Sequence, residues 1–196
     1  TLEQAMASPL APLHTGSVSG NGNLASELKV NYNGKELSGA ALAAQARAWE
    51  AYGCLEGGAA RAIGLAATTK EWLDLRNRCF VLLGGSSALS PLSLLLQCGA
   101  TVIAIGRRKP AVWAKLISQA KSSAGTLVFP CADPLAGGES DAQLADKAGA
   151  DLLTQAPEIG AWLQQAVPSV GLPTTVGMYT YLDSDAHVRV SLACDM

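Results

Sequence analysis

The stretch that decides the fold covers residues 79–108 and reads CFVLLGGSSALSPLSLLLQCGATVIAIGRR. It contains two short, continuous apolar runs, at 80–83 and 101–105, which are typical of parallel strands buried on both faces. The leucine-rich segment between them begins with a serine–proline pair, as a helix N-cap and first turn favour, and ends at Gly99, a common helix-closing residue. These residues predict a strand–helix–strand unit with a tight glycine turn after the first strand.

The turn after the first predicted strand has the spacing of a phosphate-binding loop. Gly84 and Gly85 end the strand, where the backbone needs positive φ or a close approach, and Ser86, Ser87 and Ser90 follow. The turn resembles the G-x-G-x-x-x-G form of the Rossmann dinucleotide fingerprint, with Ser86 and Ser90 in place of the second and third glycines. The resemblance implies that these five residues hold a pyrophosphate, through serine hydroxyls and the positive end of the helix.

Two arginines, Arg107 and Arg108, follow the second predicted strand. An NAD site has a carboxylate at this place for the ribose hydroxyls, whereas an NADP site has a cation for the 2′-phosphate. The cations therefore favour NADP(H) over NAD(H), and a solvated basic loop is the alternative interpretation. Asp133, after the third predicted strand, lies where short-chain dehydrogenases have an aspartate that contacts adenine. A turn-forming aspartate before a proline is the alternative there.

The rest of the chain continues the alternation of strands and helices. Helices are expected over 110–122, 141–148 and 158–166, and strands over 126–129, 151–154 and 176–181. The end of the chain can be a strand, because Val188 and Val190 alternate with polar residues, or a helix from Ala186, which we favour. The sequence therefore predicts an α/β fold with a doubly wound, mainly parallel, Rossmann-like sheet.

The domain boundaries follow from composition. Residues 1–28 are rich in Ser, Gly, Asn, Pro and Ala, and we expect an extended N-terminal arm that stays mobile or lies on another protein subunit. Residues 29–196 are expected to form one Rossmann-like domain. Within it, 29–77 form a helical preface that covers the sheet, and 78–196 form the alternating strands and helices.

The preface itself has three local signals. Asn33-Gly34 after an alternating segment predicts a hairpin turn, and Gly53 ends a helix that is expected over 39–52. Thr68 begins a sequence that resembles a capping box, which predicts a further helix towards Arg76.

Composition and charge exclude several classes of partner. The 196 residues carry a formal net charge of −2 and no long run of Lys or Arg, so nucleic acid is not an expected partner. No apolar run approaches the roughly 20 residues of a membrane span. The five cysteines are scattered without C-x-x-C spacing, which favours thiols in a reducing compartment, cytoplasm or plastid stroma, over disulfides. Asp183, Asp185 and His187 are metal-ligand types, but an acidic helix cap is the preferred interpretation and no metal is expected.

The residues of short-chain dehydrogenase catalysis are missing. Those enzymes use a tyrosine and a lysine four residues later, whereas the tyrosines here are followed at that spacing by Glu36, Glu56, Asp183 and Asp185. The chain is similar to uncharacterised Rossmann-type proteins of eukaryotic algae over roughly residues 68–196, which implies a fold and an organellar setting. Two hypotheses remain: an NADP(H)-binding, oxidoreductase-like protein, and a non-catalytic accessory subunit of a larger assembly that docks through its N-terminal arm.

Overall fold

The structure is a computed structural model that describes residues 11–195. The chain divides into two units, and each is described by itself. The larger, called the sheet unit, comprises residues up to 22 together with 76 onwards. The smaller, called the hairpin–helix unit, is Asn23–Leu75.

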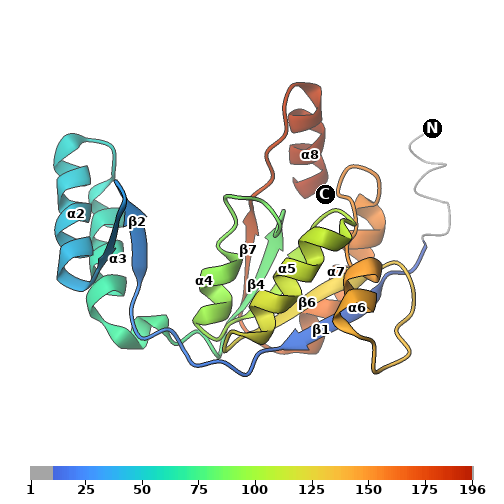
Figure 1. The fold of residues 1–196 in the computed structure, drawn as a ribbon. Helices are drawn as coiled ribbons and strands as arrows, with labels where there is room; N and C mark the ends of the chain where they lie inside the picture. Colours follow the sequence, from blue (N-terminus) through green and yellow to red (C-terminus); the bar gives the residue numbers. More distant parts are fainter. Residues whose placement is uncertain (1–10, 196) are drawn as a thin grey trace. The chain divides into compact units, whose positions relative to one another are not determined.

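The centre of the sheet unit is a five-stranded sheet in the order β1-β6-β5-β4-β7 (Figure 1). Its strands are β1 (His14–Ser19), β4 (Cys79–Leu83), β5 (Thr101–Ile105), β6 (Thr126–Cys131) and β7 (Thr174–Met178). Strands β4 to β7 are parallel, and β1 runs antiparallel to β6. The carboxyl ends of four strands therefore meet at one edge of the sheet, which is where ligands collect in open α/β sheets.

Helices cover both faces of this sheet. They are α4 (Leu92–Gln97), α5 (Pro110–Lys121), α6 (Asp141–Lys147), α7 (Ala156–Val170) and α8 (Asp185–Asp195). On one face Trp113 of α5 packs on Phe129 of β6, with ring centroids 5.2 Å apart. On the other, Trp162 of α7 joins a buried cluster with Val81 and Ile103 from the central strands. The two apolar layers account for the burial of the central strands on both sides.

The α/β class predicted from the sequence is confirmed, as a mostly parallel five-stranded sheet flanked by helices. The strand order is compatible with a Rossmann-like fold. Strands β4 and β5 and helix α5 begin and end within one residue of the ranges predicted for them. Among residues 11–195, no helix combines the length and the apolar character that crossing a bilayer needs.

The prediction of an extended N-terminal arm over 1–28 that stays mobile or lies on another subunit was wrong for residues 14–19. Residues His14–Ser19 form β1, paired along its whole length with β6 of the same chain. Gly16 and Val18 are buried on one side of the strand, while Thr15 accepts a hydrogen bond from the Trp162 indole at 2.9 Å. Small side chains that look like linker sequence are therefore needed here, because the strand packs closely on its neighbours. Residues 1–10 lie outside the described part.

The strand predicted over 151–154 was also wrong. This segment is a turn that leads directly into α7: the Asp151 side chain accepts a hydrogen bond from the Leu153 amide, and the Gln155 side chain accepts one from the Asp151 amide. Its apolar residue Leu152 is buried, but as part of a loop. The last strand begins and ends earlier than the predicted 176–181, and the C-terminal segment is the helix α8, as favoured.

The single domain predicted over 29–196 was wrong, because residues 23–75 form a compact unit of their own. Its elements are β2 (Lys29–Tyr32), β3 (Lys35–Ser38), α2 (Gly39–Tyr52), α3 (Gly57–Thr68) and the short 3-10 helix η1 (Lys70–Leu73). The hairpin turn at Asn33 and Gly34 is confirmed, with φ of 49° and 72°. The capping-box sequence at Thr68 gives only the single turn of η1, because α3 already extends to that residue.

Candidate functional site

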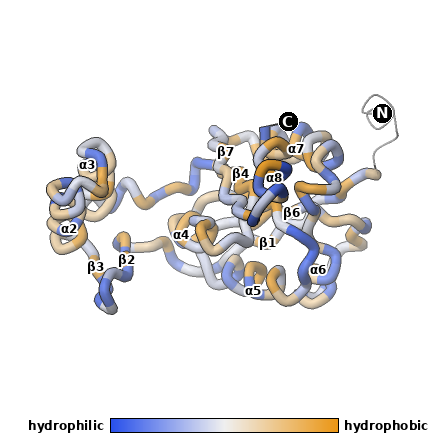
Figure 2. The backbone as a smooth tube through the Cα atoms, turned by 90° about the horizontal axis from the view of Figure 1, so that it is seen from above, coloured by the Kyte–Doolittle hydropathy of each residue, from blue (hydrophilic) through white to orange (hydrophobic). Residues whose placement is uncertain are grey.

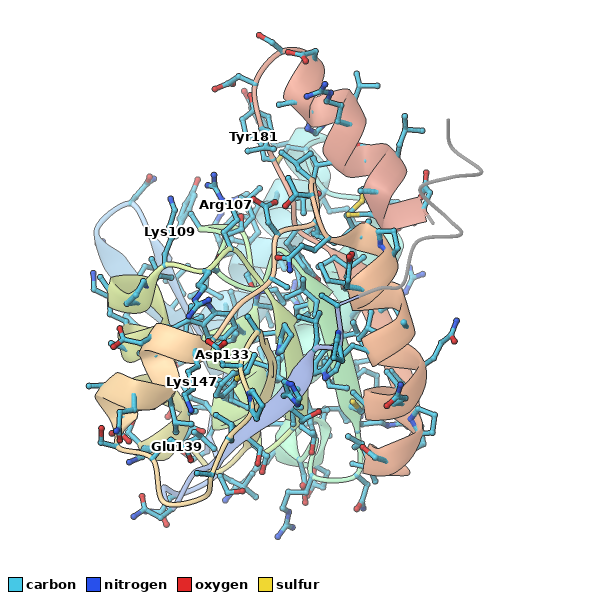
Figure 3. All side chains as sticks on the ribbon, turned by 90° about the vertical axis from the view of Figure 1, so that its right-hand side faces the viewer. Arg107, Lys109, Asp133, Glu139, Lys147 and Tyr181 are labelled. Atoms are coloured by element: carbon cyan, nitrogen blue, oxygen red, sulfur yellow. The ribbon has the colours of Figure 1, made fainter. Side chains whose placement is uncertain are left out.

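A cavity of about 170 Å³ lies at the carboxyl edge of the sheet. Its walls come from the ends of β4, β5 and β7, from the turn at 150–153 and from α8. Figure 3 shows two of its lining residues, Arg107 and Tyr181, at the end of the unit where the parallel strands finish. The carboxyl ends of β4, β5 and β7 therefore contribute to one cavity.

The glycine turn closes one side of the cavity and is held tightly by its neighbours. Gly84 has φ of 89°, and a Cβ atom there would lie 2.9 Å from the Tyr179 backbone. The Gly84 and Gly85 amides both donate to the Ile105 carbonyl, at 3.0 and 2.8 Å. A residue with a side chain at position 84 would have to adopt a disfavoured backbone conformation and displace the end of β7. The turn is thus fixed in place by both neighbouring strands.

The three serines of the predicted phosphate loop have different positions. Ser86 and Ser87 line the cavity, and Ser86 is exposed. The Ser87 hydroxyl accepts a hydrogen bond from the Leu89 amide, and the Ser90 hydroxyl accepts one from the Leu92 amide at the start of α4. Ser90 does not line the cavity, and its hydroxyl holds the backbone at the start of α4. Of the predicted loop, Gly84, Ser86 and Ser87 are therefore at the cavity, while Gly85 and Ser90 support the turn.

Arg107 contributes a cation to the cavity wall. Its side chain is exposed, and no hydrogen bond or ion pair to it is found within residues 11–195. Its backbone is fixed, because the fully buried Trp113 donates its indole N–H to the Arg107 carbonyl at 3.1 Å. Gly149, with φ of 111°, lies directly beneath: a Cβ atom there would lie 2.6 Å from the Trp113 indole nitrogen. Trp113 and Gly149 thus hold the Arg107 backbone in place, while its side chain remains available to bind an anion.

Arg108 has a different role from its neighbour. Its Nε donates to the Asp146 carbonyl at 2.9 Å, and its Nη2 is 3.2 Å from the Asp133 carboxylate. Neither Arg108 nor Asp133 lines the cavity. In Figure 3 Asp133 lies below Arg107 and near Lys147, the last residue of α6. Arg108 and Asp133, predicted to contact a 2′-phosphate and an adenine, pair with each other and connect the loops that follow β5 and β6.

The loop after β6 is closed by a second ion pair. The Glu139 carboxylate accepts hydrogen bonds from the Ala136 and Gly137 amides and lies 3.3 Å from the Lys147 ammonium. The hydrogen bond from the Ala136 amide lowers the pKa of Glu139 most, and the Glu139 amide and Lys147 lower it further. Burial raises the pKa of the Cys131 thiol, at the end of β6, to about 11. This thiol is therefore protonated and inert near neutral pH.

Sequence reasoning missed most of the remaining wall. The segment 179–182 and Val190 of α8 line the cavity, as do Asp151 and Leu152. The first of these could have been found, because residues 179–181 form the carboxyl end of the last predicted strand, 176–181. No local sequence pattern indicated Val190, because its place in the cavity wall depends on how α8 packs against the rest of the sheet unit. Within residues 11–195 no group of His, Cys, Asp and Glu has a metal-binding arrangement.

Comparison with protein-family models, curated proteins and solved structures finds no match for this chain.

Proposed function

We propose that the protein has a Rossmann-like fold and binds NADP(H) at the carboxyl edge of its sheet. The observation that carries the proposal is that Arg107 lines the same cavity as Gly84, Ser86 and Ser87 of the glycine turn. A phosphate there would meet an exposed serine hydroxyl and a guanidinium that forms no ion pair within residues 11–195. Asp151 also lines the cavity, and its carboxylate accepts the Leu153 amide. Charge-assisted hydrogen bonds of this kind are the strong ones in phosphate recognition.

The support for the helix end as a phosphate site is weaker than the support for Arg107. Helix α4 has only 6 residues and begins at Leu92, after the turn rather than within it. The turn's own amides at Gly84, Gly85 and Ser87 already donate to backbone carbonyls. Side-chain donors therefore carry the proposed binding. Phosphate recognition is expected to depend on Arg107 and Ser86 more than on the helix dipole.

The cavity volume limits what enters it. Ligand pockets commonly measure about 300–1,000 Å³, whereas this cavity measures about 170 Å³. A phosphate-bearing part of the dinucleotide fits inside, and the rest lies over the rim.

Tyr179 and Tyr181 line the cavity, and no lysine does so among the described residues. A reaction of the short-chain dehydrogenase type therefore has no support, and the proposal is limited to binding.

The test is a comparison of NADPH and NADH affinities by titration calorimetry. Wild-type protein should bind NADPH more tightly, because only NADPH has a phosphate for Arg107. Arg107→Ala should weaken NADPH binding by roughly 10- to 100-fold, the usual value of hydrogen bonds to a charged group, and leave NADH binding nearly unchanged.

The matched control is Lys109→Ala. Lys109 is an exposed cation of the same segment as Arg107, but it does not line the cavity. This substitution should leave both affinities unchanged. Ser86→Asp should abolish binding of both nucleotides through repulsion of phosphate, while the melting temperature stays near the wild-type value. Equal affinities for NADPH and NADH, or equal effects of Arg107→Ala and Lys109→Ala, would contradict the proposal.

A non-catalytic accessory role remains the second proposal. It is supported by the small cavity and by the fact that, among residues 11–195, no lysine lines the cavity with the tyrosines. The expected docking element, the N-terminal arm, no longer supports it for residues 14–19, which pair within the sheet. A partner would have to use another surface of the sheet unit.

A further inference from the structure

Strand β7 is an open edge of the sheet. It pairs with β4 on one side, and nothing pairs with it on the other within residues 11–195 (Figure 1). Its sequence, TTVGM, contains no charge and no proline, and charges, prolines and bulges are the usual protection of an edge strand. Val176 and Met178 are 64% and 51% exposed. The strand is therefore available, and suitable, for pairing with another strand.

The register fixes which backbone groups point outward. The Cys79 amide donates to the Pro173 carbonyl, and the Tyr179 amide donates to the Leu83 carbonyl. In a parallel ladder alternate residues point to the same neighbour, so residues 175, 177 and 179 face β4. The amide and carbonyl groups of Thr174, Val176 and Met178 then face the open side. Their side chains also share one face of the sheet, because they are two residues apart.

The segments that form β7 and its paired strand β4 carry no charged residue. The chain carries 14 Lys and Arg and 16 Asp and Glu, yet none occurs in 79–106 or in 159–182. These two runs include β4, α4, most of α7 and β7, so the uncharged segments adjoin one another in the sheet. Figure 2 shows the contrast between a mainly hydrophobic α4 and a mainly hydrophilic α6. Depletion of charge is the compositional mark of an interface core.

We propose that a second copy of this chain pairs with β7 across a twofold axis at Val176. The three outward residues are symmetric about that position: Val176 would exchange both hydrogen bonds with its counterpart, and Thr174 would pair with Met178 of the other copy. An antiparallel pair of this type satisfies every outward group of both strands. Strand β7 is uncharged on both sides of the axis, so it matches itself without electrostatic repulsion. Twofold dimers are also the commonest closed assemblies.

The size of the edge predicts a moderate affinity. Five residues at about 3.4 Å each give a ladder of roughly 17 Å, and a helix–sheet–helix stack is roughly 30 Å thick, so the edge offers roughly 500 Å² per copy. A standard interface has about 800 Å² per partner. The dimer should therefore dissociate in the micromolar range rather than form an obligate pair.

The test is sedimentation equilibrium of the full chain from about 1 to about 100 µM, the range in which a micromolar dimer dissociates. The mass of the wild-type protein should rise from 20.1 kDa towards twice that value. Val176→Lys should remain monomeric, because the axis places the two ammonium groups directly opposite each other. Val176→Pro removes only an outward amide and should weaken the dimer roughly tenfold, through two symmetry-related hydrogen bonds.

The matched control is Val188→Lys on α8, which adds the same charge at a valine of similar exposure, 60%. It should dimerise like the wild-type protein. A wild-type chain that stays monomeric at 100 µM overturns the proposal. So does a dimer that survives Val176→Lys, or one that Val188→Lys weakens equally, because the contact would then lie elsewhere or depend on net charge alone.

Discussion

Replacing Gly16 by alanine tests whether β1 belongs to the sheet as the structure has it. A Cβ atom at this position would lie 2.3 Å from the Phe129 ring. The ring has no room to move, because Phe129 is fully buried and packs against Trp113. The new methyl group must therefore push β1 away from β6 or force the ring off its preferred rotamer.

The cost follows from what overpacking does in cores. Adding a methyl group to a tightly packed site costs about 1–3 kcal/mol. For a protein of this size, each kcal/mol lowers the melting temperature by about 2–4 °C. Gly16→Ala should therefore melt about 2–12 °C below the wild-type protein in differential scanning calorimetry.

Gly160→Ala is the matched control for this substitution. Gly160 lies on the exposed side of α7, and nothing lies within 4 Å of a Cβ atom built there. The change should stabilise the protein by about 0.5–1 kcal/mol, since alanine is the better helix residue. If Gly16→Ala melts with the wild-type protein while Gly160→Ala shows its gain, β1 does not pack over Phe129 and the sheet has one strand fewer.

Two further predictions concern ionisable groups. The lowered pKa of Glu139 means that its carboxylate stabilises the fold above its ordinary pKa of 4.5 and that this stability is lost as the pH falls through the lowered value. Glu139→Gln should therefore melt lower than the wild-type protein at neutral pH and lose less stability on acidification, measured as melting temperature against pH; parallel curves would contradict this. For the thiols, burial raises the pKa of Cys131 to about 11, whereas Cys54 is exposed. A thiol reagent at about pH 8 should label Cys54 first, and the fast phase should disappear in Cys54→Ser; a fast phase that remains would contradict it.

The sequence was a good guide where local signals and burial agree. The two apolar runs around the glycine turn became β4 and β5, since a short apolar segment between turn residues is buried on both faces. The hairpin at Asn33 and Gly34 formed because those residues tolerate the positive φ of a tight turn. In these places one or two neighbouring residues carry the whole signal.

The sequence was a poor guide where the structure depends on distant partners. Residues 14–19 are small and polar, and only pairing with β6 makes them a strand. The segment 151–154 has the apolar pair of a buried strand, but its side-chain hydrogen bonds make it a turn before α7. A short apolar run shows that a segment is buried, and does not show what shape it takes there.

The candidate site shows the same limit within a single pair of residues. Arg107 and Arg108 look equivalent in the sequence, yet one lines the cavity and the other binds Asp133 and the Asp146 carbonyl. Both residues lie beyond Ile105, the last residue of β5, where the alternation of a strand no longer applies. The sequence alone therefore does not distinguish the cation of the cavity from the cation of the neighbouring loops. Which of the two faces the cavity is decided by Gly149, the Trp113 indole and the Asp133 carboxylate, which lie far along the chain and become neighbours only in the folded sheet unit.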